Sequence, residues 1–315
     1  MKKSASLGAA FALALSLHPF FGRLQASPAT PQKSREQKAH IQVQVNLVSI
    51  LASVLDADGR PVLDLPKDAF DVYEEGVQQN VERFEAQTNR PLDLVLMMDT
   101  SSSTYKELRF EAEAAARFIQ QVVRSDDRLA FFEFTDSVTE LSDFSGNVSA
   151  LQAAARRVTS GGGTSLYDAV FLGAKTLTRR AADRRRVIVL VTDAGETTSV
   201  STFDEARRNA ILSGALLYTI LIRPVKNENG RNTAGEHALI TITDSTGGAM
   251  YHADELDQLD AMFERINREL RTQYLLGYYA NPPPPPGSYR RVELKVKGGY
   301  TLHYRKGYFA GGSSR

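Results

Sequence analysis

Two aspartates, each at the end of an apolar run, are the residues of this chain best suited to do chemistry together. Asp99 ends the run Leu92–Asp99, and Asp193 ends the run over residues 187–193. Nearly continuous apolar runs are typical of parallel strands that are buried on both faces. In open α/β sheets the site lies outside the carboxyl ends of the strands, so we expect both carboxylates to point into one crevice.

Hydroxyl side chains accompany both aspartates. Ser101 and Ser103 follow Asp99 in the pattern D-x-S-x-S, and alternate side chains of an extended turn face the same way. Three glycines and Thr164 lie between the two runs, where the glycines let the backbone come close and Thr164 adds a further hydroxyl. The candidate metal ligands are therefore Asp99, Ser101, Ser103, Thr164 and Asp193.

These five side chains offer only hard oxygen donors, without histidine or sulfur. Such a set suits Mg²⁺, Mn²⁺ or Ca²⁺ rather than zinc or copper, and we expect Mg²⁺ first. Neutral hydroxyls and water leave the cation incompletely neutralised. A carboxylate from an Asp or Glu of another protein can then complete its octahedron, so the sequence predicts a metal-dependent binding site.

The elements that must position this site alternate between strands and helices. Alternation of this length implies a mostly parallel sheet covered by helices on both faces. Strands are predicted at residues 92–99, 128–134, 187–193, 216–222 and near 250, and helices at 105–123, 147–158, 166–179, 203–212, 238–243 and 254–271. We assign residues 91–272 to this α/β domain. The basic run 184–186 before one buried strand is interpreted as a solvated edge.

The segments on either side of the α/β domain have the alternating pattern of short β-strands. Residues 40–90 and 273–311 are each too small to bury a face alone, so we predict that they are two halves of one small β-sandwich. The prolines at 282–286 are interpreted as a loop between strands, and residues 312–315 as a tail.

The first 29 residues have the pattern of an export signal. Lys2 and Lys3 precede an apolar stretch over residues 7–17, and cleavage is expected after Ala26 or Ala29, followed by a polar leader to residue 39. No later stretch is apolar enough to span a bilayer, so no transmembrane segment is expected in the mature chain. Cysteine is absent, which excludes disulfides and thiolate sites and favours the bacterial periplasm or a secreted bacterial protein. The net charge of +1 argues against nucleic-acid binding.

The segments D-x-S-x-S, G-G-G-T-S-L-Y-D-A and V-T-D together resemble the metal-ion-dependent adhesion site (MIDAS) of the von Willebrand factor A (VWFA) domain family. The resemblance implies a Rossmann-like, doubly wound domain with a divalent cation at its top, held at the five positions named above. The flanking segments, such as Tyr274–Tyr279, are similar to those of exported "VWFA-related" proteins abundant in acidobacteria. Two departures are Ser102, where the family usually has glycine, and Ala194, which precedes Gly195 where glycine commonly follows the aspartate at once.

From these observations we predict a binding module for adhesion or complex assembly, not an enzyme, with a protein partner that presents an Asp or Glu carboxylate. Two alternatives stay open. A metal-assisted hydrolase needs a general base, and Glu196 is the only unassigned acid near the motifs. A structural envelope scaffold with a degenerate metal site would not respond to a chelator. The sequence leaves the oligomeric state open.

Overall fold

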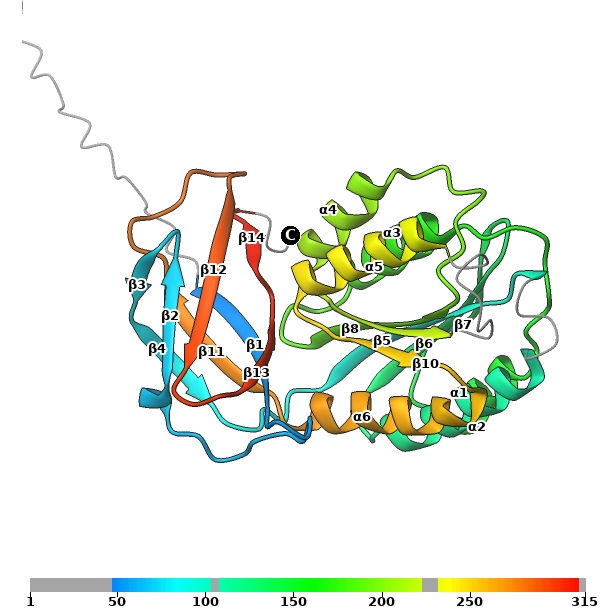
Figure 1. The fold of residues 1–315 in the computed structure, drawn as a ribbon, viewed down its shortest axis with the longest axis horizontal. Coiled ribbons are helices and arrows are strands. Elements are labelled where there is room, and N and C mark those ends of the chain that lie inside the picture. The colour runs from blue at the N-terminus through cyan, green and yellow to red at the C-terminus, as the bar shows by residue number, and fades with distance from the viewer. Residues whose placement is uncertain (1–46, 103–107, 223–231, 312–315) are drawn as a thin grey trace, which may run out of the picture. The chain divides into compact units, whose positions relative to one another are not determined.

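The computed structural model describes residues 47–102, 108–222 and 232–311. Residues 44–315 form one compact unit. Its central sheet has the strand order β10-β9-β8-β5-β6-β7 (Figure 1). The bounds of these strands are β5 Leu92–Asp99, β6 Arg128–Phe134, β7 Val138–Ser145, β8 Arg185–Thr192, β9 Leu216–Ile222 and β10 Met250–Ala253.

The central sheet is parallel except for its edge strand β7, which pairs antiparallel with β6. From β5 the chain moves to one side for β6 and β7, and then returns to the other side of β5 for β8, β9 and β10. The boundary between β5 and β8 is therefore the topological switch point of the sheet. Crevices for ligands form outside the carboxyl ends of strands at such a point.

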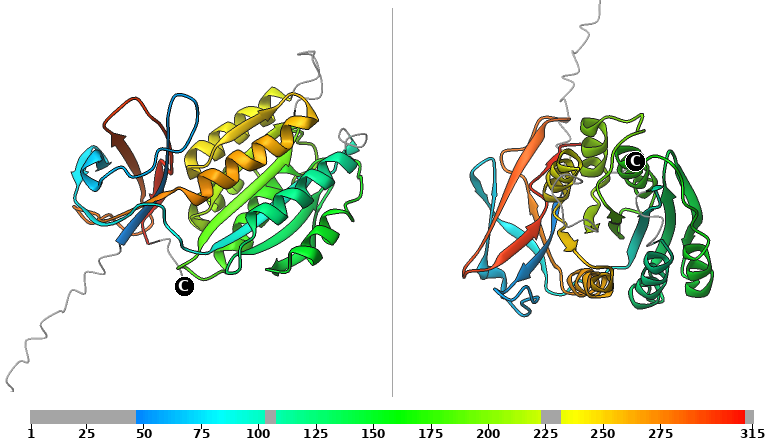
Figure 2. Two further views of the ribbon diagram at one scale, coloured as in Figure 1. Left: turned by 90° about the horizontal axis from the view of Figure 1, so that it is seen from below. Right: turned by 45° about the vertical axis from the view of Figure 1, so that its right-hand side comes forward.

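Helices cover both faces of this sheet, α1, α2 and α6 on one face and α3, α4 and α5 on the other (Figures 1 and 2). Alternation along the strands explains this, since Leu94 and Leu96 of β5 pack in the first layer and Val95 and Met97 in the second. The helix bounds are α1 Leu108–Val122, α2 Val148–Ala155, α3 Leu166–Thr178, α4 Phe203–Ser213, α5 Thr233–Thr246 and α6 Leu259–Arg271.

Local signals fix the ends of these helices, as α4 illustrates. Thr202 and Glu205 form a capping box, in which each side chain accepts a backbone N–H from the other residue. The helix ends at Gly214, whose φ of 68° is left-handed and is accessible to glycine without strain.

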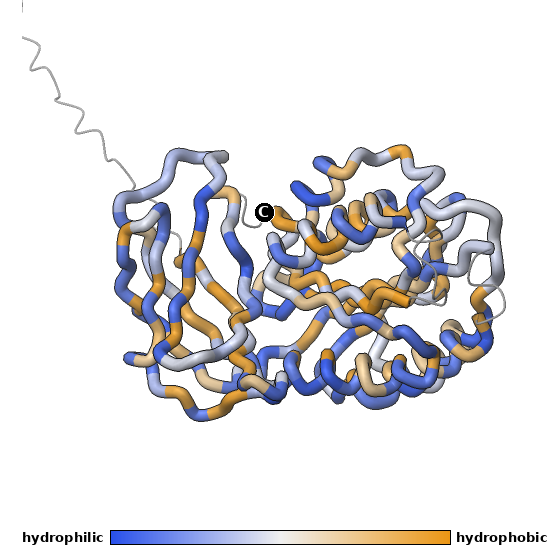
Figure 3. The backbone as a smooth tube through the Cα atoms, viewed as in Figure 1, coloured by the Kyte–Doolittle hydropathy of each residue, from blue (hydrophilic) through white to orange (hydrophobic). Residues whose placement is uncertain are grey.

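Two further sheets, β13-β1-β11-β4 and β14-β12-β2-β3, pack face to face as a β-sandwich with its own hydrophobic core. Each sheet combines strands from before and after the α/β region. Figure 3 shows hydrophobic and hydrophilic positions alternating along these strands. The strand bounds are β1 Leu47–Leu55, β2 Phe70–Glu74, β3 Val77–Gln79, β4 Val81–Glu85, β11 Tyr274–Tyr279, β12 Tyr289–Val296, β13 Thr301–Tyr304 and β14 Gly307–Phe309.

The predicted fold class is confirmed: a mostly parallel α/β sheet is flanked by antiparallel sheets built from both chain segments. The edge strand β7 and the two short strands β3 and β14 were not predicted, and α5 extends well beyond the predicted 238–243. The start of α6 was predicted too early, because residues 256–258 form a short 3-10 turn before it. The exact domain boundaries stay predictions, and the export signal lies outside the described residues. Within the described ranges, no helix is both long and apolar enough to cross a membrane.

The prediction of a solvated edge at residues 184–186 is wrong. Arg185 is only 3% exposed, and its guanidinium donates to the carbonyl oxygens of Arg90, at 2.9 Å, and of Leu270. Arg184 pairs with the fully buried Asp93, at 2.7 Å between Nε and Oδ1. The segments that enter and leave the α/β region pass over this edge of the sheet, so the side chains lie beneath them.

Candidate metal centre

The candidate site lies at the carboxyl ends of β5 and β8, on the two sides of the switch point. β5 ends at Asp99, and β8 ends at Thr192, one residue before Asp193. The strands are parallel neighbours in a register that places Met98 opposite Val191. Both aspartates therefore leave the sheet at the same edge.

Asp99 is a buried carboxylate held by hydrogen bonds. It is 1% exposed, its Oδ1 accepts the N–H of Ser101 at 3.1 Å, and its Oδ2 accepts the hydroxyl of Thr192 at 2.6 Å. Burial and, to a lesser extent, the nearby charge of Asp193 together raise the pKa of Asp99 to about 6, against the lowering effect of the hydrogen bonds from Thr192 and Ser101. Burial and a second carboxylate both disfavour this charge, so a bound cation would stabilise it.

Thr164 and Asp193 meet above Gly195. A Cβ atom on Gly195 would lie 3.0 Å from Oγ1 of Thr164 and 3.1 Å from Oδ1 of Asp193. The N–H of Gly195 also donates to this Oδ1 at 2.9 Å. The hydroxyl and the carboxylate therefore face one small space, which stays open because residue 195 has no side chain.

Ala194, one of the departures from the family pattern, takes a strained conformation to make this arrangement. Its φ is 65°, a left-handed value that residues other than glycine seldom adopt. Its side chain is fully buried, and its carbonyl oxygen packs so closely on Gly235 that a Cβ there would lie 2.0 Å away. Packing against the first turn of α5 thus holds Ala194 in its left-handed conformation. Backbone strain commonly persists only where the surrounding structure fixes it in this way.

The glycine loop between the strands is anchored from β6. Asp136, which follows the end of β6, accepts the N–H groups of Gly162 at 3.2 Å and Gly163 at 2.8 Å. Ser102 donates its hydroxyl to the carbonyl oxygen of Gly162 at 3.0 Å, which ties the loop to the end of β5. Asp136 was not predicted from the sequence, although its signal is similar: an acid two residues after the end of a strand of the sheet.

Of the five predicted ligands, four lie in the described residues at this edge of the sheet. Ser101 is 2% exposed and hydrogen-bonds Asp99 through its backbone and its hydroxyl. Thr164 is 4% exposed, and its N–H donates to Thr197 Oγ1 at 2.9 Å, which fixes its backbone. Ser103 lies outside the described residues.

The donor set fits a hard divalent cation. It consists of two carboxylates and two hydroxyls, and hydroxyls or water must supply the other ligands, because no group of three acidic or histidine side chains able to hold a metal occurs in the described residues. Mg²⁺ is commonly held by one or two carboxylates while it keeps several waters. Such a site leaves coordination positions open to an external ligand.

Glu196, the only base that the hydrolase alternative offered, has another role. Its carboxylate accepts the N–H of Tyr167 at 3.1 Å, at the first turn of α3, and the hydroxyl of Ser199 at 2.7 Å. It also accepts the N–H of Ser199 at 3.0 Å. These three bonds engage both oxygens of Glu196 in capping α3 and closing the loop after β8, so most of its lone pairs accept from structural donors.

Comparison with known proteins agrees with the fold. The family model described as the von Willebrand factor type A domain matches residues 94–196. No curated protein matches the chain in sequence. The resemblance to the exported acidobacterial group stays a prediction.

Three of the solved structures that the chain matches are the following. A von Willebrand factor type A protein from Catenulispora acidiphila is 14% identical, with 78% of each chain covered and a TM-score of 0.48. The conserved hypothetical protein BatB from Bacteroides thetaiotaomicron is 14% identical, covering 57% of this chain and 100% of its own, with a TM-score of 0.46. The pilus adhesin SpaC from Lactobacillus rhamnosus GG is 12% identical, covering 81% of this chain and 48% of its own, with a TM-score of 0.48.

Proposed function

We propose that this chain, whose residues 94–196 match the family model of the von Willebrand factor type A domain, is an exported, metal-dependent protein-binding module for adhesion or complex assembly. A divalent cation, Mg²⁺ in the first place and Mn²⁺ or Ca²⁺ as alternatives, would be held by Asp99, Ser101, Ser103, Thr164 and Asp193. When bound, it offers a coordination position to the carboxylate of an Asp or Glu on the partner protein.

The observation that carries the proposal is the meeting of Thr164 Oγ1 and Asp193 Oδ1 over Gly195, beside the buried Asp99. Two carboxylates placed together at the end of a sheet repel each other, and their repulsion is relieved most directly by a cation between them. The protein's own part is positional. Thr192 and the backbone of Ser101 orient Asp99, and Gly195 orients Asp193.

Binding is favoured over hydrolysis by the position of Glu196. A general base must reach the proton that it removes, directly or through one water. Glu196 is instead held by Tyr167 and Ser199, and Asp99 and Asp193 are assigned to the metal. The proposed export to the periplasm or outside the cell rests on residues 1–29, and N-terminal sequencing of the mature protein tests it.

The experiment compares thermal melts of the wild type and of Thr164→Val in EDTA and in millimolar Mg²⁺ or Mn²⁺. Valine keeps the shape of threonine and removes only the hydroxyl that faces the site. A ligand that binds the folded state alone stabilises it by about 2.7 kcal/mol at a hundredfold excess over the dissociation constant. We expect this rise in the wild type, a loss of at least tenfold in metal affinity for Thr164→Val, and no loss for the control Thr139→Val, an exposed threonine of β7.

A second experiment tests whether the partner presents a carboxylate. The wild-type protein serves as bait in envelope extracts, with Mg²⁺ or with EDTA. Capture of the partner protein must require both the metal and Thr164. It must also be lost when the Asp or Glu of the partner at the contact is changed to Asn or Gln. Identical melts with and without metal would instead indicate the structural scaffold. Metal affinity that survives unchanged in Thr164→Val would show that the cation is held elsewhere.

A further inference from the structure

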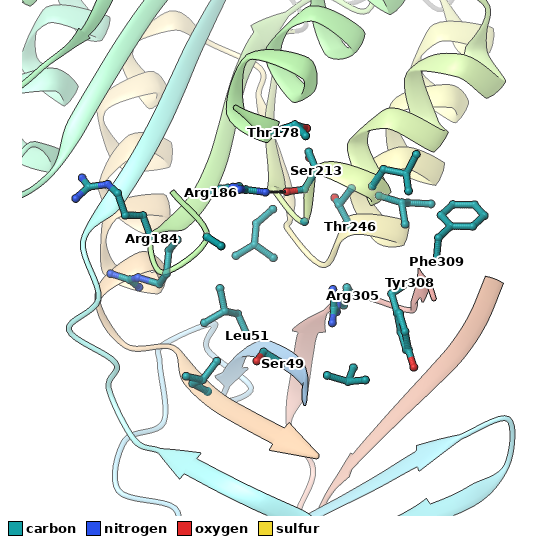
Figure 4. Close-up of a pocket in the computed structure, with 18 of the residues that line it drawn as sticks. Ser49, Leu51, Thr178, Arg184, Arg186, Ser213, Thr246, Arg305, Tyr308 and Phe309 are labelled. Atoms are coloured by element: carbon teal, nitrogen blue, oxygen red, sulfur yellow. Dashed lines mark hydrogen bonds between the residues drawn. The ribbon is translucent and has the colours of Figure 1, made fainter. Parts of the chain in front are cut away.

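A second site lies at the other end of the central sheet. A cavity of about 280 Å³ opens at the start of β8 and β9, close to the last residues of α3, α4 and α5, and strands β1, β11 and β14 of the sandwich complete its wall (Figure 4). Its size is near the lower end of the range for small-molecule pockets. β8 runs from this cavity to the candidate metal centre, a distance of roughly 25 Å at about 3.3 Å per residue.

The charged residues that line this cavity are all cationic. Five arginines contribute to the wall, and no Asp or Glu does: Arg90, Arg184, Arg185, Arg186 and Arg305. Two of them have acidic partners behind the wall, since Arg184 pairs with Asp93 at 2.7 Å and Arg90 lies 3.7 Å from Glu85. The guanidinium of Arg185 is committed to backbone carbonyls.

Among the five lining arginines, Arg305 is the one without a hydrogen-bonded or ion-paired acceptor in the described part of the chain. It lies between β13 and β14, and its side chain makes no hydrogen bond or ion pair within the described residues. Its Nε is buried without a partner, and its guanidinium lies over the ring of Tyr308, 5.3 Å from the centroid. Burial lowers the pKa of Arg305, because removal from water disfavours the positive charge.

Arg186 faces the same cavity from the other side. Its two terminal nitrogens donate to the carbonyl oxygens of Ser213, at 2.8 Å, and Arg180, at 2.7 Å, so these dipoles share part of its charge. Its Nε, however, has no acceptor. Figure 4 shows Arg186 with Ser213 on the β8 side of the cavity, and Arg305 with Tyr308 on the sandwich side.

Apolar side chains form much of the remaining wall. Leu51 of β1, Leu275 of β11, Ile211 of α4 and Phe309 of β14 line the cavity, and Ser49 adds a hydroxyl that bonds no described residue. Ligand pockets typically combine such an apolar lining with a few placed polar groups. The wall therefore suits a ligand with an apolar body and one anionic group.

We propose that this cavity binds a small organic anion, whose carboxylate or phosphate group pairs with Arg305 and whose apolar part packs on the leucine side chains. The planar guanidinium of arginine matches both groups bidentately, and the charge of Arg186 on the opposite wall adds to the attraction for an anion. This site shares no residue with the metal centre and stands independently of the proposed function.

The test measures binding of benzoate, phenyl phosphate and the neutral benzamide to the full chain by isothermal titration calorimetry. We expect the anions to bind at least tenfold more tightly than benzamide, and the stronger of the two identifies the anionic group. Arg305→Gln removes the charge from a residue that makes no ion pair in the described part of the chain, and should weaken anion binding at least tenfold. The control Arg291→Gln makes the same change of net charge on the exposed surface of β12, and should leave the dissociation constant unchanged.

Three results would overturn this site. One is equal affinity for benzoate and benzamide, and another is unchanged anion binding by Arg305→Gln. The third is an absence of binding by every probe to a wild type that melts cooperatively. The metal response is measured on the same variants, and an intact response in Arg305→Gln shows that the two sites are separate.

Discussion

Replacement of Asp99 by asparagine should stabilise the metal-free protein while it destroys metal binding. The pKa of Asp99 rises from 3.8 to about 6 in the folded state, and a difference of this size corresponds to about 3 kcal/mol of free energy. Asparagine removes the buried charge but weakens the hydrogen bond from Thr192, at a cost of about 1 kcal/mol. The net gain of about 2 kcal/mol should raise Tm by about 4–8 °C in EDTA at pH 7.5.

The sign of the pH dependence follows from the raised pKa. Above pH 6, Asp99 is ionised in both the folded and the unfolded protein, and the folded state carries the full cost of burying the charge. As the pH falls through 6, the folded protein takes up the proton first, so the wild type becomes more stable relative to Asp99→Asn. Below pH 3.8 the carboxyl of the unfolded chain is protonated too, and the contribution of Asp99 to the stability difference between the two proteins disappears.

The assay is urea denaturation in EDTA at pH 7.5, 6.0 and 4.5, with Asp168→Asn as the control. Burial raises the pKa of Asp168, but hydrogen bonds from Ser201 and from the N–H of Val200 outweigh burial and leave the pKa lowered. Its ionised form therefore stabilises the fold, and Asp168→Asn should unfold at lower urea than the wild type. A lower stability of Asp99→Asn than of the wild type at pH 7.5, or a stability advantage that is constant across the three pH values, would refute the burial cost assigned to Asp99.

Three further substitutions test other parts of the structure. Gly195→Ala places a Cβ 3.0 Å from Oγ1 of Thr164, so the Mg²⁺-dependent rise in Tm should shrink by more than half, and a full rise would show that this space is not used. Arg271→Ala leaves the buried Asp127 without its ion pair and should lower the free energy of unfolding in urea by about 3 kcal/mol, whereas a change below 1 kcal/mol would contradict this. Gly248→Ala brings a Cβ within 1.9 Å of a carbonyl oxygen of β9 and should lower the free energy of unfolding in urea by about 3 kcal/mol. An unchanged free energy of unfolding would show that the backbone shifts freely at this position.

The elements that position the metal centre could be predicted because their signals are local. The apolar runs of β5 and β8 are buried on both faces, and the acid after each run marks the carboxyl edge of the sheet. Alternation of strands and helices then gives a parallel sheet. The edge strand β7 was missed because it is half exposed, so its polar side chains hide the period of a strand.

The electrostatic state of the site required the structure. The sequence indicates that Asp99 and Asp193 share an edge of the sheet, but not that Asp99 is buried and Asp193 is only partly so. That difference comes from Thr192, which covers Asp99, and from the turn through Ala194, whose left-handed backbone directs Asp193 toward Gly195. Neither contact has a signature in residue type or spacing.

The arginine run at 184–186 shows the limit of local patterns most clearly. Three consecutive cations normally indicate a solvated surface, because an unpaired buried charge is costly. Arg185 is buried here because residues far along the chain supply acceptors, at Arg90 before β5 and at Leu270 at the end of α6. The same long-range closure brings Arg305 to this edge of the sheet, where its guanidinium has no hydrogen-bonded acceptor or ion pair among the described residues. A cationic cavity of this kind is therefore a property of the tertiary fold, and its unpaired guanidinium is the feature that a bound anion would complete.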